Sequence, residues 1–425
     1  MSVQVRRRWL AVLSATALFI AGCGSSSSSH SSPSASQSSA SQSSASQSSA
    51  SAKGPIPIGV LTSITGLFAP WGLEARDGMQ FAVNQINSSG GVDGRKLQLF
   101  VADDQSQPAA GIDAFKRLTE QDHVIAIGGV IDSDVGVATA RLAEAAQIPY
   151  FMSKAGASEI LTTSSRYTFR TCLPAAQEIS GAYIQYAASK HLTRVGAINA
   201  DYAWGQAIGS GLQTAAAQYP SVKVKTEVAP VDTTDFTTYL RGLSGSNPQL
   251  IMATGHPPGT PAIVVQSQKL GLNVPCDRAG LPVSVDRQGR RGASLWPLHR
   301  HQVHARRQPG LPESRPGVPE SVPRDHFFDD DALASYAVVN IVAQAIRSVG
   351  ADPVKIASFH ANTFNIPGFA YPLAWTSWGE LSQARLAITL LTKGPAPQGT
   401  NTGGTWYLKQ LLLSKPLTPA VGLRV

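Results

Sequence analysis

The stretch PIPIGVLTSITGLFAPWGLEARDGMQFAVNQINSSGGVDGRKLQLFVADD, residues 55–104, decides the fold class. It opens with an apolar strand at residues 56–61 and closes with a second one at residues 97–101. Between the two strands, apolar side chains recur at helical spacing: Met79, Ala82, Val83 and Ile86. Apolar strands joined by an amphipathic helix are typical of a parallel α/β sheet that is covered by helices on both faces.

The same alternation continues toward the middle of the chain. Apolar spacing predicts helices around Ile112, Phe115 and Leu118 and around Val135, Ala138 and Leu142, and strands at residues 124–127 and 149–152. After Cys172 a second set begins, with a helix near residues 179–188 and strands at residues 195–199, 222–228 and 250–253. We therefore predict two doubly wound parallel-sheet domains, with their sites at the carboxyl ends of the strands.

The N-terminus has the order of an export signal. Arg6, Arg7 and Arg8 precede an apolar run at residues 9–22, which is too short to cross a bilayer comfortably as a helix. The run ends in Ile20-Ala21-Gly22-Cys23, which resembles a bacterial lipobox whose cysteine carries the lipid. We therefore expect a signal peptide at residues 1–22, lipidation of Cys23, and anchoring to the outer face of the cell membrane.

Residues 23–54 are expected to form a flexible linker, because they are almost all Ser, Ala and Gln and cannot bury a core. The formal charge of +8 does not indicate a nucleic-acid partner. Three of the positive charges leave with the signal peptide and a net four lie within residues 276–325, so the remainder is nearly neutral. The remaining cysteines, Cys172 and Cys276, form no disulfide framework, although one bridge between them stays possible.

Several short motifs then occur in a fixed order along the chain. They include Thr65-Gly66, residues 69–72 (APWG), residues 90–94 (GGVDG), Asp103-Asp104, residues 127–129 (IGG), Ser133, residues 153–158 and residues 201–205 (DYAWG). Together they resemble the type I periplasmic binding proteins of the leucine/isoleucine/valine-binding family. The resemblance implies two lobes joined by a hinge: residues 55–172 with about 327–395, and residues 173–275 with about 396–425.

The resemblance also implies a function and a site. The expected function is capture of a small amino acid, amide or similar polar solute in an interlobe cleft, by a monomer that delivers the solute to an ABC permease. The ligand-binding residues it implies are Trp71, Ser133, Ala155, Ala157 and Trp204. Trp71 and Trp204 could instead only pack in the protein, and Ser133 could be a simple helix N-cap.

Position 157 departs from the family pattern. Relatives that bind α-amino acids offer a Thr hydroxyl there, whereas this chain has Ala157 followed by Ser158. This difference weakens the case for a branched-chain amino acid and leaves amides, urea-like solutes and other small acids open.

Enzyme motifs are missing from the sequence, which contains no Gly-x-Ser-x-Gly elbow, phosphate-binding loop or His-Glu-x-x-His. His299, His301 and His304 lie among Arg and Pro without an acid or cysteine at matching spacing, so we expect no metal site and no cofactor. The alternatives are an exported hydrolase of small amides and a tethered ligand-sensing ectodomain.

Residues 276–325 do not fit the surrounding pattern. The periodicity of helices and strands stops there, Lys, Ile, Thr, Tyr, Phe and Met disappear, and nine Arg occur. A long irregular insert inside a compact domain is unusual. One interpretation is a natural disordered loop; the other is translation in a shifted reading frame between two compensating frameshifts, which would damage the second lobe.

Overall fold

The computed structural model describes residues 54–254, 259–272 and 330–367, the backbone of 276–279, 293–296, 387–393 and 406–413, and parts of 369–385 and 416–419. The predictions for residues 1–53, which include Cys23 and nearly all of the linker, lie outside the described residues. So do the side chains of residues 276–325, including His299, His301 and His304.

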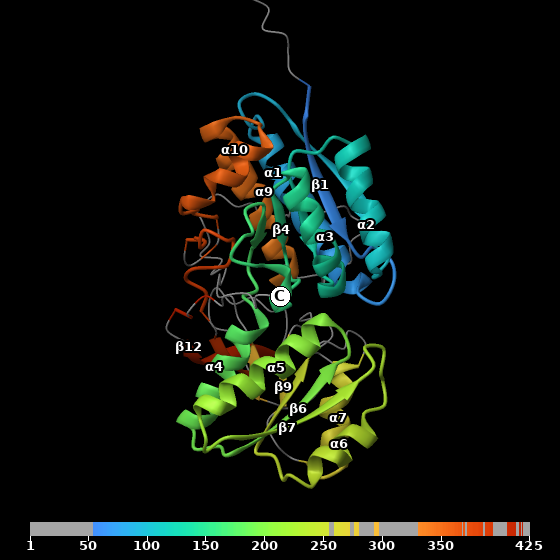
Figure 1. Ribbon diagram of the computed structural model, residues 1–425, viewed down its shortest axis with the longest axis vertical. Coiled ribbons are helices and arrows are strands. Elements are labelled where there is room, and N and C mark those ends of the chain that lie inside the picture. Colours follow the sequence, from blue (N-terminus) through green and yellow to red (C-terminus); the bar gives the residue numbers. More distant parts are fainter. Residues whose placement is uncertain are drawn as a thin grey trace, which may run out of the picture. The chain divides into compact units, whose positions relative to one another are not determined.

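The first sheet has five parallel strands in the order β2-β1-β3-β4-β5 (Figure 1). They are β1 (Ile56–Thr62), β2 (Leu97–Asp103), β3 (Ile127–Val130), β4 (Tyr150–Met152) and β5 (Thr168–Arg170). The helices that cover it are α1 (Ala69–Ser88), α2 (Pro108–Lys116) with a π-helical turn η1 (Arg117–Gln121), α3 (Ser133–Ala146) and α9 (Asp330–Val349). The predicted parallel α/β class is thereby confirmed.

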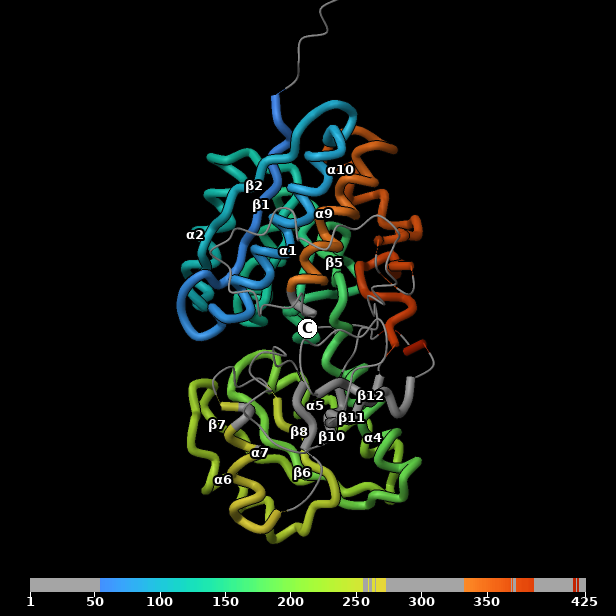
Figure 2. The backbone as a smooth tube through the Cα atoms, turned by 180° about the vertical axis from the view of Figure 1, so that it is seen from behind, coloured from blue at the N-terminus to red at the C-terminus, as the bar shows by residue number. Residues whose placement is uncertain are grey.

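Alternate residues of β1 face two separate cores. Ile56, Ile58 and Val60 pack with α1 and α9, whereas Leu61 packs with α2 and α3 on the other face. Helix α9 comes from far along the chain but lies beside α1, as Figure 2 shows. The two helices touch at Gly78, where a Cβ would lie 2.0 Å from the carbonyl oxygen of Ala332.

Helix α9 has the length and apolar composition of a membrane span over Ala332–Val349, but 72% of that window is buried inside the protein. This burial is what a core helix requires. Strand β3 begins three residues later than its apolar pattern predicts. Gly128 lies within β3 and packs closely on α9, since a Cβ there would come 2.6 Å from Val338.

The second sheet has four parallel strands in the order β7-β6-β8-β9. They are β6 (Arg194–Ala200), β7 (Lys223–Ala229), β8 (Leu250–Thr254) and β9 (Cys276–Ala279). Helices α4 (Ala176–Ser189) and α5 (Ala203–Gln218) cover one face, and α6 (Thr237–Ser244) and α7 (Thr260–Lys269) cover the other. Alternate residues of β8 follow this division, since Leu250 and Met252 face α4 and α5 while Ile251 and Ala253 face α6 and α7.

The sequence predicted that regular helices and strands stop at Cys276, but two short strands begin at or after that residue. Strand β9 extends the second sheet by pairing with β8, which needs only backbone groups. Strand β10 (Ala293–Trp296) joins β11 (Ala387–Lys393) and β12 (Trp406–Leu413) in a three-stranded antiparallel sheet. The lobe boundaries near residues 327 and 395 stay a prediction. Cys172 is buried.

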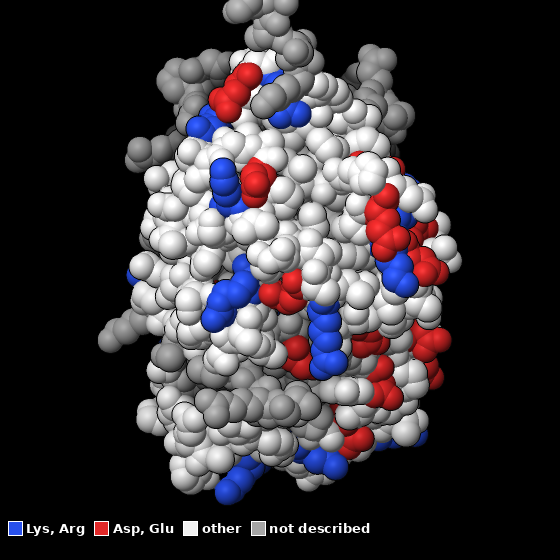
Figure 3. Space-filling view, turned by 45° about the horizontal axis from the view of Figure 1, so that its top comes forward, with Lys and Arg blue, Asp and Glu red and all other residues white. Residues whose placement is uncertain are grey.

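Three short helices complete the described part: η2 (Ser158–Ile160), α10 (Pro353–Ser358) and η3 (Phe359–Ala361). On the face drawn in Figure 3, Lys and Arg side chains are interspersed with Asp and Glu, and most of the described surface is uncharged. This face offers no continuous basic area.

Candidate functional site

Trp71 lies in the first turn of α1, which follows the carboxyl end of β1. It is 5% exposed and packs with Phe68, Ile131 and Tyr202. Phe68 places its ring 5.8 Å from that of Trp71 and 5.3 Å from that of Tyr202. The buried Trp71 Nε1 has no hydrogen-bond acceptor among the described residues.

Lys154 follows β4 and lies on the same aromatic group. Its Nζ is 5.1 Å from the centroid of the Trp71 ring, within the range of a cation–π interaction. The backbone N–H of Lys154 donates to the carbonyl oxygen of Val130 at the end of β3. The ends of β1, β3 and β4 thus bring an indole and an ammonium together.

Ser133 is not the N-cap of α3. Asp132 has that position, and its carboxylate accepts a hydrogen bond from the N–H of Asp134 over 2.9 Å. The hydroxyl oxygen of Ser133 instead accepts from the N–H groups of Gly156, at 3.1 Å, and Ala157, at 3.2 Å. The cap interpretation of Ser133 is therefore wrong, and the side chain holds the loop that follows β4.

Arg170 fixes the opposite side of that loop. Its Nη1 donates to the carbonyl oxygen of Ala155 at 2.8 Å, and its Nη2 donates to that of Ala157 at 2.7 Å. The remaining Nε donates to Glu380 at 2.7 Å, and both side chains of this ion pair are buried. Burial raises the pKa of the Glu380 carboxyl, although the charge of Arg170 opposes the shift.

Trp204 is the second residue of α5 and contacts the same loop from the other sheet. Its Nε1 donates to the hydroxyl of Thr254 at the end of β8, over 2.6 Å. Its ring lies against Gly156, where a Cβ would come 2.2 Å from the ring atom Cζ3. Only glycine leaves room for the ring at this position.

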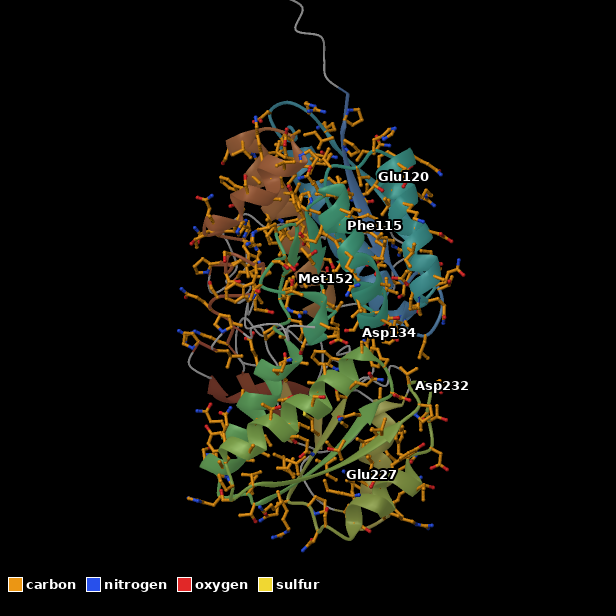
Figure 4. All side chains as sticks on the ribbon, in the orientation of Figure 1. Phe115, Glu120, Asp134, Met152, Glu227 and Asp232 are labelled. Atoms are coloured by element: carbon orange, nitrogen blue, oxygen red, sulfur yellow. The ribbon has the colours of Figure 1, made fainter. Side chains whose placement is uncertain are left out.

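Acidic groups surround the start of α3. Burial raises the pKa of Asp132 to about 7, since its charged form loses hydration that the N–H groups of α3 only partly replace. Asp134, labelled in Figure 4, accepts the N–H of Ala203 at 2.8 Å. Burial also raises the pKa of Tyr202 well above its usual value, and the nearby Asp132 and Asp134 add to the shift.

Asp103 and Asp104, which the sequence singled out, shape the loop between β1 and α1. Asp103 accepts hydrogen bonds from the N–H groups of Ile64 and Thr65 and from the Thr65 hydroxyl. Asp104 accepts from the Ser63 hydroxyl at 2.6 Å. In the part of the chain that the structure describes, no cluster of three or more His, Cys, Asp or Glu could hold a metal ion.

Comparison with known proteins identifies this arrangement. Residues 55–285 match the family model of the periplasmic binding proteins. The chain belongs to this family. The resemblance predicted from the sequence motifs is thus confirmed, and the family is one of substrate-binding proteins of ABC transporters.

Among its relatives, this periplasmic binding protein is 25% identical over 214 residues to Leu/Ile/Val-binding protein homolog 7 of Brucella suis, covering 48% of the chain and 53% of the relative. It is 34% identical over 120 residues to homolog 8 of Brucella abortus, covering 28% and 30%. The chain thus spans about half the length or less of these curated relatives.

Solved structures share the fold. A solute-binding protein of R. palustris in complex with benzoate has a TM-score of 0.69 at 18% identity, over 87% of this chain and 99% of that one. A leucine-binding protein of Thermotoga maritima has a TM-score of 0.68 at 18% identity, over 85% and 99%.

The periplasmic binding protein brings Trp71, Ser133, Ala155 and Ala157 to one edge of its first sheet, with Trp204 reaching the loop from the second. Sequence reasoning missed Lys154, Gly156 and Arg170. Lys154 and Gly156 lie inside the 153–158 motif and could have been noticed there. Arg170 could not, because its partner Glu380 is 210 residues away.

Proposed function

We propose that the chain is an extracytoplasmic solute-binding protein that captures a small solute and delivers it to an ABC permease. One observation carries the proposal: Trp71, Ser133 and the 155–157 loop lie at the carboxyl ends of the first sheet, and Trp204 of α5, which covers the second sheet, packs on that loop. Ligands of doubly wound folds bind at such ends. Membership of a substrate-binding family agrees with this role.

We propose that the solute is a small amino acid, amide or similar polar molecule. Two proteins of the same fold support this range, one solved with benzoate and one described as leucine-binding. We further propose that the protein is a monomer that is anchored to the membrane by lipid on Cys23. Residues 23–54 would be the flexible linker between the membrane and the lobes. The signal-like N-terminus and the Ser-rich composition support this part.

Calorimetry on a soluble Cys23→Ser variant tests the capture step. Trp71→Ala should weaken binding of the captured solute by about 1 to 3 kcal/mol if Trp71 is a buried ligand contact. Trp378→Ala is a matched control, because Trp378 also has a buried Nε1 without an acceptor among the described residues. It precedes Gly379, whose carbonyl oxygen accepts the N–H of Arg170 in β5, and it is not part of the aromatic group around Trp71. Equal affinity of the Trp71 variant and the wild type would assign Trp71 to packing alone.

The same samples separate a carrier from a hydrolase. A carrier returns its solute chemically unchanged, so chromatography of the released ligand should show one compound. Conversion of a small amide to its acid would instead favour the exported hydrolase.

We also propose that residues 276–325 were read in a shifted frame, on the strength of their composition. The coding DNA should then contain one gained or lost base near codons 275–278 and a compensating one near codons 324–328. If neither of the two alternative reading frames of codons 276–325 encodes an apolar strand followed by helical periodicity, the segment is a true insertion. Binding should therefore be measured on the chain as translated and on a version with the frame restored.

A further inference from the structure

Three consecutive carbonyl groups of the loop after β4 are bound by other parts of the chain. Arg170, the last residue of β5, donates to the carbonyl oxygens of Ala155 and Ala157. The carbonyl oxygen of Gly156 accepts the N–H of Ala176, the first residue of α4, over 3.0 Å. The loop therefore joins a strand of the first sheet to a helix that covers the second sheet.

Glu380 connects the same two elements from another side. Its carboxylate accepts from Arg170 Nε at 2.7 Å and takes a backbone hydrogen bond from Ala175, which directly precedes α4. The backbone of Arg170 is bound to the same segment as Glu380. Its N–H donates to the carbonyl oxygen of Gly379, and its carbonyl oxygen accepts from Trp375 Nε1. This segment therefore fixes the point at which the chain leaves the first sheet for the second.

The pair is suited to hold a backbone in place. Arg170 is 0% exposed and Glu380 is 1% exposed, so two charges have been removed from water at a cost that an apolar pair would avoid. A planar guanidinium has donors in fixed directions and binds one carboxylate and two carbonyl groups here at the same time. An apolar pair could fill the same space but could not bind the loop.

The position of the loop matters because Gly156 is where it meets α5. A Cβ at Gly156 would lie 2.2 Å from the ring atom Cζ3 of Trp204 and 2.7 Å from Leu173 Cδ2, so the ring fits only a narrow range of loop positions. Trp204 is itself fixed by its hydrogen bond to Thr254 at the end of β8. Displacement of the loop would therefore open or obstruct this contact.

We propose that Arg170 and Glu380 are positioning residues for solute capture. Both act through the backbone, because they hold the loop and the start of α4 in the arrangement in which Trp204 packs on Gly156. This inference rests on the proposed solute-binding function and adds to it a requirement away from the aromatic group around Trp71. Solute affinity then depends on an ion pair that the solute does not touch.

Hydrogen exchange read by mass spectrometry tests the positioning role without a solute. In the Cys23→Ser chain, the double variant Arg170→Met/Glu380→Leu leaves no charge of the pair buried, so urea unfolding should recover much of the stability that Arg170→Met alone loses. The amides of Gly156 and Ala157 should still exchange at least about tenfold faster than in the wild type, because the loop carbonyls have lost their donors. Wild-type exchange of these amides in the folded double variant overturns the inference.

A second pair of variants does not depend on recovery of stability. Glu380→Gln and Glu380→Leu are similar in volume, and both leave the charge of Arg170 without its partner. Only Gln keeps an acceptor for Arg170 Nε and for the N–H of Ala175. The loop amides should therefore exchange at least about threefold more slowly in the Gln variant than in the Leu variant. Equal exchange in the two would show that Glu380 does not position the loop.

Glu144→Ala is the matched control for general loss of stability. Glu144 accepts the N–H groups of Tyr167 and Thr168 at the opposite end of β5. Its loss should leave exchange of the Gly156 and Ala157 amides within about threefold of the wild type. If Glu144→Ala speeds their exchange as much as the double variant does, the Arg170–Glu380 pair serves the fold alone.

Solute affinity separates this inference from the proposed function. The probes are leucine, acetamide and benzoate, each titrated by calorimetry into the Cys23→Ser chain as translated and with the frame restored. A probe that binds the wild type should bind the double variant at least about tenfold more weakly and Glu144→Ala within about threefold. Equal affinity for the double variant overturns the inference and leaves the proposed function standing. If no probe binds either version, the proposed function fails, and the exchange experiment still decides whether the pair positions the loop.

Discussion

The carboxylate of Asp134 in α3 accepts a hydrogen bond from the backbone N–H of Ala203, at the first residue of α5, over 2.8 Å. Helix α3 covers the first sheet and α5 covers the second. The first N–H groups of a helix have no partner inside the helix and carry the positive end of its dipole. A side chain of one lobe therefore caps a helix of the other.

Replacing Asp134 should loosen this contact. Asp134→Ala is expected to lower the free energy of unfolding by about 0.5 to 2 kcal/mol, the usual effect of losing a cap, as measured by urea denaturation. Asp113→Ala is the control, since Asp113 is an exposed acid on α2. If the two variants lose stability equally, the bond to Ala203 contributes nothing specific.

Gly156→Ala should interfere with the approach of Trp204. The added methyl would lie 2.2 Å from the ring and 2.7 Å from Leu173, and overpacking of this kind costs about 1 to 3 kcal/mol. Gly181→Ala in α4 meets open space and should be neutral or stabilising. We expect Trp204→Leu to rescue Gly156→Ala in part, and absence of rescue would show that the ring is not the obstacle.

Arg170→Met should be among the most destabilising substitutions in the first lobe. It leaves Glu380 buried without its partner and frees two loop carbonyls, and breaking a buried pair on one side costs about 3 to 5 kcal/mol. The double variant Arg170→Met/Glu380→Leu should recover much of this loss in urea unfolding. The half-exposed pair Arg117–Asp122 is the control, and Asp122→Asn should cost less than about 1 kcal/mol.

Asp132 should make stability depend on pH. Its pKa is about 7 in the folded protein and near 3.8 in the unfolded chain, so the folded state holds the proton more tightly. Its contribution is fully present below about pH 4 and is lost as the pH rises through 7, by up to about 4 kcal/mol. Asp132→Asn keeps an N-cap without titrating and should flatten this part of the unfolding profile. Parallel profiles of the variant and the wild type between pH 4 and 7 would contradict the assignment.

The lipid anchor has a direct test in cells. A fatty-acid probe should label the protein through Cys23, and Cys23→Ser should abolish the label and release the chain from the membrane fraction. Continued labelling of that variant would exclude lipidation at this residue.

Strands and helices of the two sheets could be predicted from periodicity because each buries one regular face. Element boundaries were predicted less well. The structure places Gly128 inside β3, where it packs on α9, a helix more than 200 residues away that a local pattern does not reveal. Trp71 lies in α1 because Pro70 is accommodated in the first helical turn. The site residues implied by resemblance do gather, but the hydrogen bonds of Arg170 and Asp134 join residues 210 and 69 positions apart, which no local pattern encodes.

The link between Arg170 and Glu380 also sets a time order for folding. The chain emerges from its N-terminus both at the ribosome and across a membrane, so Arg170, which holds the 155–157 loop, has no acidic partner until residue 380 has emerged. Helix α9, which closes one face of the first sheet, also arrives late. A product that stops soon after the family-matched residues 55–285 would leave that face bare, and unpaired apolar surface of this kind favours aggregation. Maturation of the first lobe is therefore a late event in the life of each molecule.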